Sequence, residues 1–89
     1  MRDRAADLAR RLLAESDATP EGRVTRGFEL ALSRPPSDAE RAASVRFLET
    51  QLRRRSARDT TSSPQEIRRR ALADFAQVLF SLNEFIYVD

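Results

Sequence analysis

Residues 71–89 read ALADFAQVLFSLNEFIYVD and predict a helix that runs into a short extended tail. Between 71 and 82 the only polar side chains are Asp74, Gln77 and Ser81, and at ~100° per residue they fall on one narrow stripe. A helix with so little polar surface must be surrounded by protein, so we expect the rest of the chain to wrap it. Its large apolar side chains are expected to be buried, including Phe75, Leu79 and Leu82.

Capping residues and prolines mark the boundaries of the preceding helices. Thr19 followed by Pro20 is a helix-start signal, because threonine caps and proline fits the first turn. The segment 34–36 (RPP) must stop a helix. Ser37 and Glu40 then have the spacing of a capping box. These signals predict helices at about 3–15, 20–33 and 38–55.

The last helix follows a polar loop. Residues 56–63 (SARDTTSS) are small and polar without a period, so they predict a mobile loop. The segment 63–66 (SPQE) contains a second capping box that begins a helix at 64–82. This helix is expected to end near Asn83, which tolerates a left-handed cap. Residues 83–89 would form the tail.

The helix predicted at 38–55 has apolar residues on two sides. One face consists of Ala42, Val45, Leu48 and Leu52. Ala43 and Phe47 lie on nearly the opposite face. Two apolar faces imply two packing partners.

No segment has the alternation of a strand, and no repeat or glycine-rich loop occurs. At 89 residues the chain has room for one domain, 1–89, with a small core. We therefore predict an all-α fold, a small four-helix bundle-like domain with a short extended C-terminal tail. Its free energy of unfolding should be on the order of 5 to 10 kcal/mol.

The composition excludes most catalytic chemistry. The chain has no cysteine and no histidine, so it lacks thiolates, disulfides and the usual metal ligands and general bases. Glu29 and Glu40 could act as an acid–base pair, but Glu40 is explained by its capping box and Glu29 as a solvated position. We expect no enzyme, no catalytic or metal-binding residue, no cofactor and no small-molecule substrate. No run approaches the ~18 apolar residues of a membrane span, and residues 1–16 lack the apolar core of a signal peptide.

Seven arginines flank the predicted loop and are candidate contacts for an anion or a partner: Arg53, Arg54, Arg55, Arg58, Arg68, Arg69 and Arg70. Residues 41–70 contain nine arginines against three acids, a net charge of +6, and all sixteen basic residues of the chain are arginine. A converged surface would bind phosphates, and an acidic partner domain would satisfy the same charges. However, three consecutive arginines spread over ~200° of a helix, and no stacking aromatic accompanies them. A solvated face is the favoured interpretation, and codon usage alone would explain the arginines.

Two segments carry a family resemblance. Residues 23–48 (RVTRGFELALSRPPSDAERAASVRFL) resemble a corner near the end of a large family of planctomycete proteins. The closing phrase NEFIYVD at 83–89 is similar to the end of that family. Ser33 stands where the family usually has glycine. The resemblance implies an exported multi-domain parent with a cytochrome-c-like segment near its N-terminus, and this chain would be the last helical part of its planctomycete-specific domain of unknown function. The haem-binding motif is missing here, so no haem is expected on these residues.

These observations predict a non-enzymatic structural or interaction module at the C-terminus of a larger exported protein. Its expected partners are upstream domains of that parent or a second copy of the chain. The alternative is a small arginine-rich nucleic-acid-binding protein that uses the basic surface around residues 53–70.

Overall fold

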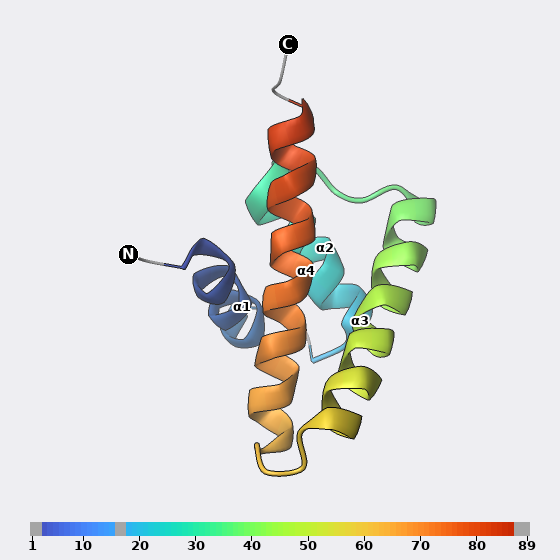
Figure 1. Ribbon diagram of the computed structural model, residues 1–89. Helices are drawn as coiled ribbons and strands as arrows, with labels where there is room; N and C mark the ends of the chain where they lie inside the picture. The colour runs from blue at the N-terminus through green and yellow to red at the C-terminus, as the bar shows by residue number, and fades with distance from the viewer. Residues whose placement is uncertain (1–2, 16–17, 87–89) are drawn as a thin grey trace.

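The computed structural model describes residues 3–15 and 18–86, with residues 83–86 described as backbone only. Four helices account for most of the described chain, and no strand occurs in it (Figure 1). They are α1 (Arg4–Glu15), α2 (Pro20–Leu32), α3 (Asp38–Arg58) and α4 (Pro64–Ile86). The predicted all-α, four-helix fold is confirmed. None of the four helices has the length and apolarity needed to cross a membrane.

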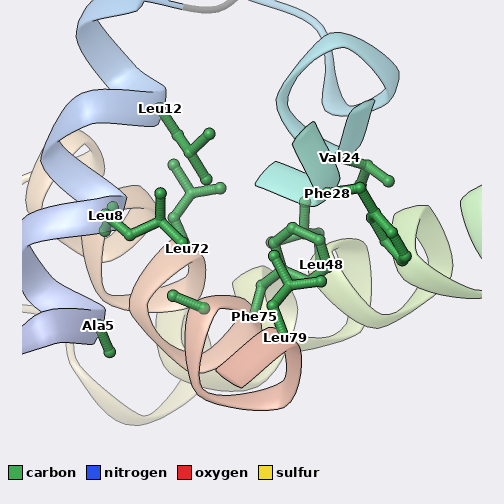
Figure 2. Close-up of a cluster of buried hydrophobic side chains, with 11 residues drawn as sticks. Ala5, Leu8, Leu12, Val24, Phe28, Leu48, Leu72, Phe75 and Leu79 are labelled. Carbon is green, nitrogen blue, oxygen red and sulfur yellow. The ribbon is translucent and has the colours of Figure 1, made fainter. Parts of the chain in front are cut away.

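Helix α4 is the centre of the molecule. In Figure 1 it lies between α1 and α3, with α2 behind it, and each of these three helices contacts it. The core between them contains apolar side chains from all four helices (Figure 2): Ala5, Leu8, Ala9, Leu12, Val24, Phe28, Leu48, Leu72, Phe75, Ala76 and Leu79. The organisation around the last helix is therefore as the sequence predicts.

Helices α2 and α4 approach each other closely in the core. The rings of Phe28 and Phe75 are tilted against each other with centroids 6.3 Å apart. A Cβ atom on Gly27 would lie 2.9 Å from Cε2 of Phe75 and 3.1 Å from Cδ1 of Leu79. Glycine is therefore required at this position to let the two helices meet.

The predicted helix starts of α2 and α3 are confirmed. The Thr19 hydroxyl accepts a hydrogen bond from the backbone N–H of Gly22 at 3.0 Å. The capping box of α3 is complete, because Glu40 N donates to the Ser37 hydroxyl at 3.1 Å and Ser37 N donates to the Glu40 carboxylate at 2.8 Å. Between them α2 ends at Ser33, whose φ of 58° is left-handed.

The corner between α2 and α3 is fixed by one arginine. Arg34 donates to both oxygens of Glu40, at 2.8 and 2.9 Å, and its guanidinium lies 5.5 Å from the centre of the Phe28 ring. The paired hydrogen bonds and the ring contact connect the start of α3 to the core residue Phe28.

Two predicted boundaries are wrong, because both long helices extend further than expected. Helix α3 continues to Arg58, so the loop predicted at 56–63 is reduced to 59–63. Asp59 organises this loop by accepting hydrogen bonds from the backbone N–H groups of Thr61 and Ser62 at 2.9 and 3.0 Å. Helix α4 continues through Asn83 to Ile86. Neither glycine nor proline follows Asn83, and asparagine costs a helix only a few tenths of a kcal/mol more than an average residue. The tail predicted at 83–89 is thus helical at 83–86, and 87–89 lie outside the described residues.

The second capping box forms only in part. Glu66 N donates to the Ser63 hydroxyl at 3.1 Å, as predicted. The Glu66 carboxylate instead accepts from Arg69 at 2.5 Å and from Arg70 at 3.2 Å. Charged guanidinium donors bind a carboxylate more strongly than a backbone N–H does, which explains the difference.

Burial of α4 differs from the prediction on one side. Phe75 and Leu79 are 1% and 0% exposed, as expected. Val78 and Leu82 are 41% and 40% exposed, so the exposed side of α4 is wider than the predicted polar stripe. The expectation that Leu82 is buried is therefore wrong, because no described element covers this side.

Candidate functional site

Part of the predicted arginine cluster is neutralised by carboxylates within the chain. Arg55 donates to both oxygens of Asp74, at 2.7 and 2.8 Å, and the Gln51 amide donates to the same carboxylate at 2.9 Å. Burial alone would raise the pKa of Asp74. The hydrogen bonds from Arg55 and Gln51 and the charge of Arg55 together outweigh burial and hold this pKa below its usual range. Asp74, predicted on the solvated stripe, is instead the anchor between α3 and α4.

Two further arginines are held by carboxylates around the 59–63 loop. Arg69 and Arg70 both bind Glu66, and Arg70 also donates to Asp59 at 3.0 Å. The hydrogen bond from Arg69 is the main cause that lowers the pKa of Glu66. The Ser62 side chain and backbone are the main causes that lower the pKa of Asp59. Both carboxylates therefore stay ionised, and the ion pair between Asp59 and Arg70 holds the loop against α4.

The other four predicted arginines have no carboxylate partner in the part of the chain described. Arg53, Arg54, Arg58 and Arg68 are exposed, and Arg53 donates to the Thr50 hydroxyl at 3.4 Å. Arg54 and Arg58 are one helical turn apart on α3, whereas Arg68 projects from α4. The cluster is thus divided into three internally paired arginines and four that remain available to a partner.

An apolar groove lies between α3 and α4. It has a volume of about 310 Å³. Ala43, Ser44 and Phe47 of α3 and Val78 and Leu82 of α4 line its walls, Phe28 and Phe75 reach it from the core, and Glu40, which is paired with Arg34, is the one charged side chain among the described lining residues. In Figure 1 the two helices meet at their shared loop and separate towards the N-terminal end of α3. The groove lies where they separate.

The two-sided pattern of α3 explains this groove. Leu48 is the single buried side chain of α3, while Val45 and Leu52 are half-buried and Ala42 is exposed. The predicted first face is therefore less buried than expected. Of the second predicted face, Phe47 is half-buried and packs against the edge of the core, whereas Ala43 is exposed; both line the groove. The sequence thus contained the signal for the groove in α3, but not the position of Val78 and Leu82 opposite it.

A larger hollow lies elsewhere among the described residues and is polar. It is an open surface depression of about 530 Å³ at the start of α2. Arg26 bridges Glu15 at 3.2 Å and Glu29 at 3.7 Å within it. Because these opposite charges are paired with each other, the depression has no strong positive or negative potential that would attract a charged ligand.

The carboxylates of interest for acid–base chemistry and metal binding are Glu40 and any acidic cluster. The hydrogen bond from Arg34, followed by that from the Ser37 backbone, lowers the pKa of Glu40 from 4.5 to about 2. Glu40 is therefore ionised at neutral pH and cannot serve as a general acid. No group of three or more acidic side chains that could hold a metal ion is found among the described residues.

Comparisons with protein-family models, with curated proteins and with solved structures found no match to this chain.

Proposed function

We propose that this chain is a non-enzymatic interaction module whose α3–α4 groove binds an acidic amphipathic helix of a partner protein. The observation that supports this is the second apolar face of α3. Ala43 is exposed and Phe47, which packs against the core on one side, leaves part of its ring at an open groove, and Val78 and Leu82 extend the apolar surface on the other wall. A domain this small gains stability from each apolar side chain it can bury. Burial against a bound partner would therefore explain why these four side chains at the groove are apolar.

A helix is the occupant that fits the shape of the groove. The groove runs between two helices, and its α3 wall includes the small residues Ala43 and Ser44. Small residues allow a third helix to approach closely, and an amphipathic helix would insert apolar side chains between Phe47 and Leu82. The volume of about 310 Å³ suits several inserted side chains.

Charge favours an acidic partner. Arg54 and Arg58 lie on the same side of α3 as Ala43 and Phe47, at spacings of seven or eleven residues that repeat the helical turn. Neither arginine has an ion-pair partner within the described chain. Acidic residues beside the apolar face of the partner helix would pair with them. Nucleic acid is less well supported, because Arg55, Arg69 and Arg70 are already bound by Asp74, Glu66 and Asp59.

The resemblance to the planctomycete family suggests where the partner helix belongs. In that interpretation the chain is the C-terminal part of a larger exported protein, and the groove receives a helix from its upstream domains. The absence of histidine and cysteine, with Glu40 held ionised, supports a binding role over an enzymatic one.

Peptide binding followed by NMR tests this proposal. The probes are a synthetic amphipathic helix with leucines at i, i+3, i+4 and i+7 flanked by glutamates, and the same peptide with lysines in place of glutamates. The acidic peptide is expected to shift the resonances of Ala43, Phe47, Val78 and Leu82, and the lysine peptide to bind at least tenfold more weakly. The variant V78Q/L82Q should abolish binding without loss of stability, since both side chains are already 40% exposed or more.

The control variant Q77A/S81A changes two exposed residues outside the groove and should bind normally. Shifts outside the groove, or equal binding of both peptides, would overturn the proposal. Sedimentation of the chain alone tests a second copy as the occupant: a dimer that V78Q/L82Q dissociates would replace the partner helix. Retention on DNA or RNA at low salt that depends on Arg54 and Arg58 but not on the groove would favour the nucleic-acid alternative.

A further inference from the structure

Arg23 of α2 has no counterion among residues 3–15 and 18–82. Its Nε atom is buried and has no hydrogen-bond acceptor among the described residues. The pKa of Arg23 is held below its ordinary value, first by burial and then by repulsion from Arg68. An N–H donor that loses water without gaining an acceptor destabilises the folded state. This position therefore lacks an anionic partner.

Arg23 and Arg68 line the same hollow. Leu48 and Leu52 of α3 and Leu72 of α4 form its apolar walls, and Glu49 lies at its edge. In the described part of the chain neither arginine is within ion-pair distance of a carboxylate, Glu49 included. The hollow shares no lining residue with the α3–α4 groove, so it is independent of the function proposed above.

Two like charges at one apolar hollow repel each other and gain from a shared anion. A guanidinium presents two parallel N–H donors that match the two oxygens of a carboxylate. A carboxylate between the arginines would accept from their guanidinium groups and would remove the repulsion, and a small turn of the Arg23 side chain would bring its Nε within reach as well. We infer that the hollow lined by Arg23 and Arg68 binds a single carboxylate group.

The size and lining of the hollow select this ligand. Its accessible volume is about 20 Å³, which is room for one small group, since a single water requires ~10–15 Å³. A flat carboxylate fits better than a tetrahedral phosphate, and the leucine walls favour a short alkyl chain behind it. The ligand is either a free short-chain carboxylic acid or the side chain of a glutamate on another polypeptide.

Arginine Nε–H resonances in ¹⁵N NMR spectra of the whole chain report on this site directly. Sodium propionate, titrated against sodium chloride and sodium phosphate at constant ionic strength, is expected to shift the signals of Arg23 and Arg68 with saturation. A dissociation constant on the order of 10 mM is expected for so small a ligand. Phosphate should bind more weakly than propionate. N-acetylglutamate amide distinguishes the sources: affinity equal to that of propionate indicates a peptide side chain, and binding of propionate alone indicates a free acid.

Two variants test the assignment. Arg68→Gln should weaken propionate binding about tenfold, because one charged donor is lost, and should raise the thermal midpoint of the ligand-free chain by removing the repulsion. Arg54→Gln, an exposed arginine outside the hollow, is the matched control and should change neither. Glu49→Gln should strengthen binding about two- to fivefold by removing a competing charge, whereas Glu29→Gln on the surface of α2 should not.

Three results would overturn the inference. The first is an Arg23 signal that responds to chloride and propionate alike. The second is unchanged propionate affinity in Arg68→Gln. The third is a Glu49→Gln variant with a lower thermal midpoint and unchanged affinity, which would mean that Glu49 itself is the counterion in solution.

Discussion

Helices α1 and α3 pack against the same central helix in opposite ways. Helix α1 has 12 residues and buries four of them, none more than 6% exposed: Ala5, Leu8, Ala9 and Leu12. Helix α3 has 21 residues, and only Leu48 is buried. It is attached instead by Arg55 and Gln51 on Asp74 and by Arg34 on Glu40.

The sequence pattern explains this contrast. The apolar residues of α1 fall on one face, whereas those of α3 are divided between two. One helix can cover only one of these faces, and polar contacts fix α3 where apolar contacts do not. Helix α3 is held by few contacts and lies beside an open groove, so it can shift at little free-energy cost when a partner binds. Helix α1, which is packed tightly on α4, keeps the rest of the domain rigid.

The largest effect is expected from truncating the shared core. Phe75→Ala should lower the free energy of unfolding by about 3–5 kcal/mol, because this ring is 1% exposed and contacts Phe28. With a total of roughly 5–10 kcal/mol, the chain would be close to unfolded. Phe47→Ala in the groove should cost less than about 1.5 kcal/mol, since the ring is only half-buried. Urea titrations compare the two, and equal losses would show that the groove is as well packed as the core.

Gly27→Ala tests how tightly α2 is held against α4. Alanine has the higher helix propensity, worth ~1 kcal/mol, but its Cβ would lie 2.9 Å from Phe75. Overpacking should dominate and lower stability by about 1–3 kcal/mol. Gly22→Ala, in the first turn of the same helix, is the matched control and should be neutral or stabilising. A Gly27→Ala protein with a raised melting temperature would mean that Phe75 and Leu79 move apart readily.

The polar attachment of α3 is tested at Arg55. Arg55→Gln should lower the free energy of unfolding by about 1–2 kcal/mol, because the paired hydrogen bonds to the half-buried Asp74 are lost. Arg54→Gln, its exposed neighbour, should change stability by less than ~0.5 kcal/mol. Thermal melts in low and high salt would measure both. Indistinguishable melts for the two variants would show that the polar contacts do not hold α3.

Acid should loosen the α3 side before the α1 side. The pKa of Glu40 is about 2 in the folded chain, against 4.5 ordinarily. A lowered carboxyl pKa stabilises the fold above the ordinary pKa, and this contribution is lost as the pH falls from about 4.5 to about 2. Glu40→Gln should cost no more than ~1 kcal/mol at neutral pH, since the side chain is partly exposed, and should flatten the fall in melting temperature between these pH values. Hydrogen exchange that speeds up first in α1 would contradict this order.

How much of this could be read from the sequence depends on how local each interaction is. The Thr19 and Ser37 caps were predictable, because the partners lie within three residues. The ends at Arg58 and Ile86 were not, because nothing near Ser56 or Asn83 forces a helix to stop. The pairing of Arg55 with Asp74 joins residues 19 apart and needs the packing of α3 on α4. The hollow at Arg23 and Arg68 likewise depends on three helices meeting.

The smallest effect is expected at the turn between α2 and α3. Ser33 has φ 58° and ψ 30°, a left-handed conformation that costs a residue with a Cβ about 1–2 kcal/mol. Ser33→Gly removes this strain but also raises the conformational entropy of the unfolded chain. The free energy of unfolding is therefore expected to rise by only ~0.5–1 kcal/mol. Ser44→Gly, in the interior of α3, should have the opposite sign, because glycine there only weakens the helix. If Ser33→Gly also destabilises the chain, the Ser33 side chain contributes to the α2–α3 corner. In that case Arg34 and Glu40 would not be enough to fix the direction in which α3 leaves α2.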